Sequence, residues 1–539
     1  MIKNKNLPMA AYFSMEYGLD AEMKTYAGGL GILAGDYIKG AKEYGYPLVS
    51  IGIKWKQGYT DQRIDEAGMP YDTYHNYNYD FLKDTGVKIK VKIRQRDVYC
   101  KVWLVDKYSN APLYLLDTDL LENEDNLITG QLYGWFGEER IAQEMVLGIG
   151  GIRALRALGI DIDVYHFNEG HAVFAGLEIL REYMDSGSDF QSALKKSKKE
   201  IVFTTHTPII QGNESHYLDR MIYMGANNGL TLEQLIEIGG SPFNMTVAAL
   251  NMSRITNAVS KLHANTANNM WKSIENHSKI IAITNAIHIP TWVDSDMLSA
   301  AQGNGSLWET HMKNKKNLIS FINERTKASL NPDVLLIGFS RRTVEYKRSN
   351  FIFSDENIIA PLLNEGKLQI VFSGKAFPQD DSGKRIVKSL VKLSKKYSNL
   401  VVFLENYDMT IGKMLTTGSD IWLNNPRRPM EASGTSGMKA AMNGVLNFSI
   451  LDGWWPEACM DGINGWQIGN GFESSDNKIL DENDLKSLYA VLINKILPTY
   501  YDNRQKWIEM MKASILSTKD YFSVKRMLEQ YYSKMYINH

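Results

Sequence analysis

Cysteine is scarce in this chain of 539 residues, which contains only Cys100 and Cys459, far apart and outside any CxxC pattern. Two isolated cysteines exclude a disulfide framework and a thiolate metal site, and they fit a reducing compartment. Long apolar runs are also missing. No stretch approaches the roughly 20 apolar residues that a membrane helix requires, and the N-terminal residues have no signal-peptide core. These absences predict a soluble, cytoplasmic protein.

An excess of charge of either sign is absent as well, since 60 basic residues face 61 acidic ones and the formal net charge is -1. No overall field would attract nucleic acid or an anionic membrane, so we expect neither as a partner. The chain is too long for one ordinary core, because a domain typically has roughly 100 to 200 residues. We therefore expect two large domains.

Short apolar runs that alternate with polar or helix-like segments organise both halves of the chain. They occupy residues 48–53, 164–168, 201–206, 280–285, 334–339, 368–372, 400–404, 421–423 and 445–450. Buried strands that alternate with helices are typical of parallel, doubly wound sheets. The pattern predicts two α/β domains, at 1–286 and 287–539. Ligands of such sheets bind at the carboxyl ends of the strands, and we expect a ligand cleft between the two domains.

The first half departs from this alternation in two places. Residues 87–93 alternate apolar and basic side chains, and with 98–106 and 113–117 they predict an inserted meander. Residues 138–158 predict a long helix, which the glycines at 148, 150 and 151 would weaken unless packing requires a close approach there.

A loop of small residues, Glu431-Ala-Ser-Gly-Thr-Ser-Gly-Met-Lys439, runs into a helix that we expect to begin near Thr435. Backbone N–H groups and hydroxyls at a helix start bind anions. Lys439 could be a point charge for that anion or, with a lowered pKa, the amine of a Schiff base. A flexible turn followed by a solvated lysine is the alternative interpretation.

A cluster of cations follows the apolar run 334–339. It consists of Arg341, Arg342, Lys347 and Arg348, with Glu345 as the one acidic residue of the run. Such density suits two phosphate dianions held close together, because arginine offers bidentate donors and lysine a compact charge. A charged helix face is the alternative, but the single local counter-charge favours phosphate binding.

The other candidate residues are glycines, histidines and an asparagine. The glycine-rich segment 25–36 could bring backbone amides against an anion, although packing or a turn explains it equally well. His206 and Asn285 end predicted strands and could hydrogen-bond a sugar hydroxyl. His166 and His171 fit no recognised metal-ligand spacing, so we expect no metal.

Together these segments resemble the α-glucan (glycogen, starch and maltodextrin) phosphorylases, specifically their short prokaryotic branch. The likeness extends from Tyr12 to Trp455 and includes the motifs at 56–63, 116–119, 147–153, 168–171 and 424–429. It implies a GT-B architecture, with two Rossmann-like domains around a cleft and a C-terminal helix near 520–535 that returns to the first domain. It also implies a glycosyltransferase of carbohydrate metabolism, which converts α-1,4-glucan ends and inorganic phosphate reversibly into α-glucose 1-phosphate with retention.

The resemblance assigns roles residue by residue. Pyridoxal 5′-phosphate would be held as an imine by Lys439, with its phosphate and ring contacted by Arg341, Thr435, Ser436 and Tyr407. The substrate phosphate would be bound by Arg342, Lys347 and the backbone amide of Gly29. The glucosyl residue would be held by His206, Asn285, Glu431, Ser433 and Gly434. In this mechanism the cofactor phosphate exchanges a proton with inorganic phosphate, and two phosphates in contact raise each other's proton affinity.

Several positions depart from the family pattern. Ala286 replaces a glycine, while Val344 and Asp408 stand where the long phosphorylases have histidine and arginine. The alternatives to a phosphorylase are a nucleotide-sugar-dependent glucan synthase, a pyridoxal enzyme acting on amino acids, and a non-catalytic glucan-binding relative. Family members often form homo-oligomers, which is possible here too.

Overall fold

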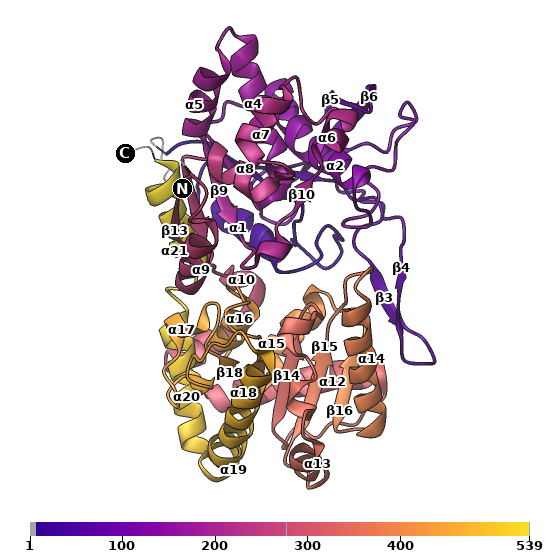
Figure 1. The fold of residues 1–539 in the computed structure, drawn as a ribbon. Coiled ribbons are helices and arrows are strands. Elements are labelled where there is room, and N and C mark those ends of the chain that lie inside the picture. The colour runs from indigo at the N-terminus through magenta and orange to yellow at the C-terminus, as the bar shows by residue number, and fades with distance from the viewer. Residues whose placement is uncertain (1–6, 276, 538–539) are drawn as a thin grey trace. The chain divides into compact units, whose positions relative to one another are not determined.

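The computed structural model describes residues 7–275 and 277–537, which fall into two compact units (Figure 1). Unit 1 is built from the segment before Thr60, from Tyr74–Thr284 and from the residues after Ser523. Unit 2 is built from Thr60–Thr73 and Asn285–Ser523. Both units contain a large sheet with parallel strands and many helices, which confirms the predicted α/β fold class. The predicted division at residue 286 stays a prediction.

In the described part of unit 1, nine strands form one sheet in the order β13-β12-β9-β8-β1-β2-β7-β6-β5. Their bounds are β1 Ala10–Phe13, β2 Leu48–Ile53, β5 Lys83–Ile93, β6 Arg96–Val105, β7 Leu113–Asp117, β8 Val164–Asn168, β9 Ile201–Thr205, β12 Ile255–Ala258 and β13 Lys279–Ala282. The strands from β13 to β7 are parallel, and β5, β6 and β7 form the predicted antiparallel meander. The strand order reverses between β1 and β8, which is where such sheets bind ligands.

The helices of unit 1 cover this sheet. They are α1 Gly29–Tyr44, α2 Glu138–Met145, α3 Gly151–Ala157, α4 Phe174–Asp185, α5 Phe190–Glu200, α6 Leu218–Met224, α7 Leu232–Gly239, α8 Met245–Met252, α9 Lys261–Trp271 and α21 Val524–Tyr531. A small strand pair, β10 Ser215–His216 and β11 Phe243–Asn244, lies among them.

The long helix predicted over 138–158 is interrupted by a π-helical turn at Val146–Gly150 between α2 and α3. Its glycines allow a close approach, as predicted. A Cβ at Gly148 would lie 2.4 Å from the backbone nitrogen of Ala175, and one at Gly151 would lie 2.6 Å from the Phe13 ring. The glycines therefore let this helix pack tightly against β1 and α4.

The C-terminal helix α21 belongs to unit 1, as predicted, and continues into a π-helical turn at Tyr532–Tyr536. The Tyr536 hydroxyl lies 2.6 Å from the Tyr37 hydroxyl on α1 and 2.6 Å from Nδ1 of His166 on β8. His166 is fully buried, and burial lowers its pKa to about 3. His166 is therefore a neutral structural residue that ties the C-terminal segment to the sheet.

In the described part of unit 2, six parallel strands form one sheet in the order β16-β15-β14-β17-β18-β19. Their bounds are β14 Leu336–Ser340, β15 Gln369–Ser373, β16 Val401–Leu404, β17 Ile421–Asn424, β18 Leu446–Ile450 and β19 Gly465–Ile468. This is the doubly wound order of a Rossmann sheet, which reverses between β14 and β17. A ligand site is expected at the carboxyl ends of these two strands.

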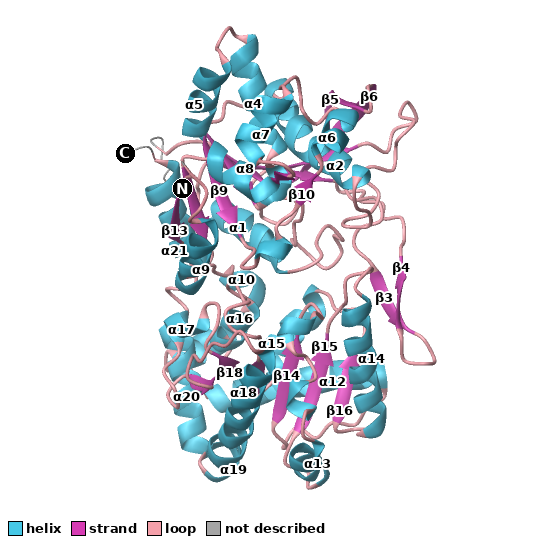
Figure 2. Ribbon diagram, in the orientation of Figure 1, coloured by secondary structure: helices cyan, strands magenta, loops and turns pink. Residues whose placement is uncertain are grey.

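Helices lie on both faces of this sheet (Figure 2). They are α10 Ile289–Trp292, α11 Ser295–Ala301, α12 Leu307–Thr326, α13 Glu356–Asn364, α14 Asp381–Lys396, α15 Met409–Gly418, α16 Ser436–Met442, α17 Trp455–Ala458, α18 Asn477–Val491, α19 Leu497–Asp502 and α20 Arg504–Thr518. Successive residues of each strand serve opposite faces: Leu336 packs in the cluster with α12 and α15, whereas Ile337 packs with α13, α18 and α20. The strands are therefore apolar on both sides.

The hairpin of β3 (Asp61–Ile64) and β4 (Pro70–Thr73) is the early part of the chain that belongs to unit 2.

None of the helices in 7–275 and 277–537 is both long and apolar enough for a membrane span.

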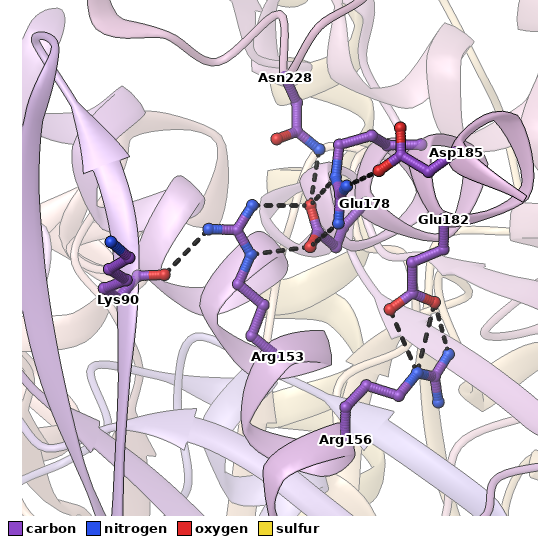
Figure 3. Close-up of polar contacts among 8 residues, drawn as sticks. Lys90, Arg153, Arg156, Glu178, Glu182, Asp185 and Asn228 are labelled. Carbon is purple, nitrogen blue, oxygen red and sulfur yellow. Dashed lines mark hydrogen bonds and ion pairs between the residues drawn. The ribbon is translucent and has the colours of Figure 1, made fainter.

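A buried carboxylate joins four segments of unit 1 (Figure 3). Glu178 on α4 accepts two hydrogen bonds from Arg153 on α3, at 2.7 and 3.1 Å, and two from Arg181, at 2.8 and 3.1 Å. Asn228 donates a further one at 2.7 Å, while Arg153 also donates to the Lys90 carbonyl of β5 at 2.9 Å. Although burial opposes ionisation, Arg181, Arg153 and Asn228 lower the pKa of Glu178 to about 2.

We expect Glu178→Gln to lower the free energy of unfolding by about 2 to 3 kcal/mol, because a neutral amide cannot accept from both guanidinium groups. The folded pKa lies below the unfolded one, so this stabilisation is present above about pH 5 and is lost as the pH falls toward 2. Denaturant unfolding followed by circular dichroism measures it.

The matched control is Glu182→Gln, which removes the surface pair with Arg156 drawn in the same view. Its cost should stay below about 1 kcal/mol. Equal costs for the two variants would show that the Glu178 network is not a main stabilising contact.

Candidate functional site

The predicted cation cluster lies where the strand order of unit 2 reverses. Arg341 directly follows β14, and its Nη1 donates to Oε2 of Glu431 at 2.5 Å. The ammonium of Lys347 lies 3.6 Å from the same oxygen. Arg348 points elsewhere, to Asp481 and Asp484 at 2.7 and 2.8 Å. The cluster near Glu431 therefore comprises Arg341 and Lys347, with the exposed Arg342 between them in sequence.

The counter-charge of this cluster is Glu431, a buried residue 90 positions away from Arg341 in the chain. The local acid Glu345, to which the sequence pointed, instead has a side chain that is 70% exposed and pairs with Arg427. Although burial opposes it, Lys347 and Arg341 hold the pKa of Glu431 below its ordinary value. Glu431 is therefore ionised at neutral pH.

Lys347 is destabilised as a cation. Burial, together with the positive charges of Arg341 and Arg342, lowers its pKa to about 8, and Glu431 opposes this shift. One carboxylate thus faces two cationic side chains, and Arg342 adds a further positive charge near Lys347. The remaining positive charge favours an anion at the carboxyl end of β14.

Asp452 holds the loop that carries Glu431, a role that the sequence analysis missed. Its carboxyl group accepts from the backbone nitrogens of Glu431 and Gly453, both at 2.8 Å. Burial raises its pKa to about 8. A Cβ at Gly453 would lie 2.2 Å from the Ser433 carbonyl, so this glycine lets the two loops touch. The signal available was the position of Asp452 just after an apolar run.

The predicted small-residue helix start is α16, which begins at Ser436 with Thr435 as its N-cap and no side-chain cap. The Ser436 hydroxyl accepts from Nη2 of Arg341 and from the Trp422 indole, each at 3.3 Å. The structure thus brings together the two segments that the sequence proposed separately as anion sites.

Lys439 lies one turn into α16 and is buried. Its ammonium stands 3.2 Å from the centre of the Trp292 ring, a cation–π contact. This position excludes the solvated lysine of the alternative interpretation. Trp292 was missed in the sequence, because nothing in its local pattern distinguishes it from a core residue.

Tyr407 is also enclosed in unit 2. Burial raises its pKa to about 12, with the positive charge of Arg341 acting in the opposite direction. A Cβ at Gly412 would lie 2.6 Å from the Tyr407 hydroxyl, so the phenol packs closely on α15. Asp408 caps α15 by accepting from the Ile411 nitrogen at 2.9 Å, and thus has a structural role.

Nε of Arg341 and Oγ of Ser433 are buried in this site and have no hydrogen-bond partner among the described residues. A buried donor without an acceptor is costly, and a phosphate oxygen is a suitable acceptor. Gly434, next to Ser433, has φ +75 and lies against the Arg341–Glu431 pair. These residues, with the buried amine of Lys439, fit a cofactor that carries a phosphate and an amine-reactive carbonyl.

In unit 1, His206 follows β9. Its Nε2 lies 2.7 Å from the Asn168 side-chain oxygen, and its backbone nitrogen donates to Glu169 at 2.8 Å. Burial lowers its pKa to about 3, so the imidazole is neutral. Asn168 in turn donates to Ser14 at 3.2 Å, beside the β1–β8 reversal. His206 is thus a fixed, neutral hydrogen-bonding group at the ligand edge of its sheet.

Packing explains part of the glycine-rich segment. Gly31 and Gly35 are packing positions, because a Cβ would lie 2.6 Å from Tyr26 and 2.1 Å from the Gly18 carbonyl. Around Gly28 and Gly29, at the start of α1, a Cβ would meet no described atom within 4 Å. No described atom therefore fills the space at Gly29, and its role in phosphate binding stays a prediction.

A second polar cluster in unit 1 was not foreseen. Ligand-type atoms of Glu144, His171 and Glu214 lie within 4.8 Å of one another. Nε of Arg140 lies 3.3 Å from Glu214, so a cation already balances this cluster. Burial raises the pKa of both carboxyl groups to about 7.

The remaining predicted residues are placed as follows. Asn285 is buried at the start of the long segment of unit 2. The φ of Ala286 is not positive, so replacing the glycine there causes no backbone strain. Val344 caps the short helix Glu345–Lys347 in extended geometry. The cofactor candidates and the phosphate candidates Arg342 and Lys347 thus belong to unit 2, whereas His206 and Gly29 belong to unit 1.

The chain is similar to proteins of a known family. The sequence model of the carbohydrate phosphorylase family matches residues 295–457. The chain is 38% identical to the maltodextrin phosphorylase of Thermococcus litoralis, over 97% of this chain and 70% of that protein. It is 33% identical to the glycogen phosphorylase of Aquifex aeolicus, over 97% of this chain and 85% of that protein. The glycogen phosphorylase of Mycobacterium tuberculosis is also 33% identical, over 98% of this chain and 70% of that protein.

The charge balance at Glu431 gives a prediction. We expect Glu431→Gln to lower the pKa of Lys347 below its value of about 8, because the variant removes the negative charge that stabilises the ammonium. Lysine NMR after reductive methylation, followed against pH, measures this. Glu345→Gln is the control and should leave that pKa unchanged, because Glu345 is exposed. A rise in the pKa in Glu431→Gln would contradict the assignment.

Proposed function

Since the chain belongs to the carbohydrate phosphorylase family, we propose that it is an α-glucan phosphorylase, a glycosyltransferase that acts with inorganic phosphate. It moves single glucosyl units between the non-reducing end of an α-1,4-glucan and phosphate, and the product is α-glucose 1-phosphate. The relatives named glycogen and maltodextrin phosphorylase match 97% of the chain. A nucleotide-sugar-dependent synthase is not favoured.

One observation of the structure carries this proposal. Arg341 and Lys347 converge on a single buried carboxylate, with Arg342 nearby, at the carboxyl end of β14. A neutral sugar has no need for such a concentration of cations, whereas phosphate dianions are stabilised by it. The excess positive charge therefore supports phosphate as the co-substrate.

We propose pyridoxal 5′-phosphate as the cofactor, because the residues of unit 2 fit it. Lys439 would bind it covalently through its buried amine, and Tyr407 would flank its ring. Arg341, Thr435 and Ser436 would hold its phosphate. Nε of Arg341, which has no partner among residues 7–275 and 277–537, supports this. When bound, the cofactor supplies a phosphate group that can give and take a proton beside the substrate phosphate.

The substrate phosphate would be bound by Arg342, Lys347 and the backbone amide of Gly29. A dianion beside Lys347 favours the ammonium form, so binding raises the lowered pKa of this lysine. The substrate phosphate would then replace Glu431 as the partner of Lys347. Glu431 would be left to accept a hydrogen bond from a glucosyl hydroxyl.

The other glucosyl contacts would come from His206, Asn285, Ser433 and Gly434. Because His206 is neutral, it can hydrogen-bond a hydroxyl without placing positive charge near the oxocarbenium-like transition state. The Ser433 hydroxyl, buried and without a partner among the described residues, is a suitable group for the same purpose. The cytoplasmic location and a homo-oligomer stay predictions from the sequence.

The first experiment is incubation with maltodextrin and phosphate, with and without added pyridoxal phosphate, while glucose 1-phosphate is measured. We expect activity that depends on the cofactor, and we expect Lys439→Ala to abolish both the activity and the visible absorbance of the bound cofactor. Lys413→Ala, at an exposed position of α15, is the control and should keep both. A colourless protein that consumes ADP-glucose would contradict the proposal.

The second experiment concerns the substrate phosphate. We expect Arg342→Ala to lower kcat/KM for phosphate roughly 10- to 100-fold, because a charge-assisted hydrogen bond contributes about 1.5 to 3 kcal/mol. Steady-state kinetics at varied phosphate measures this. Arg385→Ala removes an exposed arginine from α14 in the same unit and should change little. An unchanged phosphate dependence in Arg342→Ala would disprove the assignment.

A further inference from the structure

The hairpin β3–β4 contacts the chain just after β15 through one buried side chain. Gln62 on β3 is 2% exposed. Its Oε1 accepts from the Ala376 nitrogen at 2.9 Å, and its Nε2 donates to the Ala376 carbonyl at 3.1 Å. The side-chain amide thus pairs with both backbone groups of one residue, as a neighbouring strand would.

Ala376 lies on the extension of β15 that pairs with the segment after β14. It forms a parallel bridge with Thr343, whose nitrogen donates to the Lys375 carbonyl at 2.8 Å. The Arg341 nitrogen donates to the Ser373 carbonyl at 3.2 Å. Strand pairing therefore continues past the sheet edge on both sides of Arg342. Gln62 lies on the outer side of this extension.

The orientation of the Gln62 amide is fixed by other groups of unit 2. Nε2 also donates to Oδ1 of Asp72 on β4 at 3.0 Å, and the Thr60 hydroxyl donates to the same oxygen at 2.7 Å. Lys384 on α14 pairs with the other oxygen of Asp72 at 2.6 Å. Because Asp72 can only accept, the amide nitrogen must face it, and Oε1 must face the Ala376 nitrogen.

The hairpin is also attached beside Tyr407. The Gln62 nitrogen donates to the Asn406 side chain at 3.2 Å, and the Ile64 nitrogen donates to Glu405 at 3.1 Å. Asn406 donates to Asp61 at 3.0 Å. One hairpin therefore contacts the extension of β15, which pairs with the loop that carries Arg342, and also contacts the loop that carries Tyr407.

We propose that Gln62 is a positioning residue for phosphate binding: through Ala376 and Thr343 it fixes the backbone that presents Arg342. This inference rests on the proposed function, since it assigns Arg342 to the substrate phosphate. Gln62 does not touch the substrate. Its effect is geometric, because a displacement of about 1 Å in a positioned group costs up to about 100-fold in rate.

The test is Gln62→Met, which keeps the length of the side chain and removes its hydrogen bonds. We expect kcat/KM for phosphate to fall roughly 10- to 100-fold while KM for the glucan stays within about twofold. Isothermal titration with inorganic phosphate, without glucan, should show weaker binding by a similar factor. If Gln62 only stabilised the fold, Gln62→Met would lower the melting temperature and leave the phosphate constants of the folded protein unchanged.

Thr73→Val is the matched control on the same hairpin, because it removes the hydrogen bond from Thr73 to the Asp61 carbonyl and no contact with Ala376. It should keep the wild-type phosphate constants. Equal phosphate constants in Gln62→Met and Thr73→Val would overturn the inference.

If Gln62→Met does not fold, Asp72→Ala replaces it, since it frees the Gln62 amide to rotate and should weaken phosphate binding in the same direction, by a smaller factor. Unchanged phosphate constants in Asp72→Ala would then overturn the inference. Failure of the proposed function gives a different result, because the wild-type protein itself would then form no glucose 1-phosphate.

Discussion

A single buried carboxylate makes the cation cluster of unit 2 possible. Arg341 and Lys347 lie within 4 Å of Glu431, and Arg342 adds a third positive charge. Like charges at this density repel one another in a buried site, and desolvation adds to the cost. Glu431 offsets part of that cost and leaves the site positive. The position of Glu431 depends in turn on Asp452. The carboxyl group of Asp452 accepts hydrogen bonds from the backbone nitrogens of Glu431 and Gly453, and so links the two loops that carry these residues.

The same region explains why small residues are concentrated before Lys439. Gly434 requires a positive φ, and Gly437 has its neighbours so close that a Cβ would lie 2.6 Å from Asn447. Larger side chains at these positions would push α16 away from the sheet. Ser436 would then lose its contacts with Arg341 and Trp422. The loop is therefore built for close packing as much as for anion binding, and the two properties support each other.

Much of the sheet architecture could be predicted from the sequence, because strands buried on both faces are continuous apolar runs. β2, β7 and β8 have the predicted bounds. β12, Ile255-Thr-Asn-Ala, was missed because its polar residues are satisfied by buried hydrogen bonds such as that of Asn257 with Thr204. From the sequence, the cation cluster was predicted to bind phosphate, and Lys439 to act as a point charge or as the amine of a Schiff base. Their partners, Glu431 for Arg341 and Trp292 for Lys439, depend on tertiary contacts between distant segments, which local patterns do not contain.

The chain passes between the two units at residues 59/60, 73/74, 284/285 and 523/524. No single cut therefore separates one complete unit from the other. During synthesis the hairpin of residues 60–73 leaves the ribosome long before β14, β15 and β16. It therefore has no contact with the segments after β15 and β16 until they have been made. A fragment that begins near residue 285 would expose the polar backbone that this hairpin covers. Splitting this protein into independently expressed halves would require the hairpin to be supplied again, grafted onto the second half.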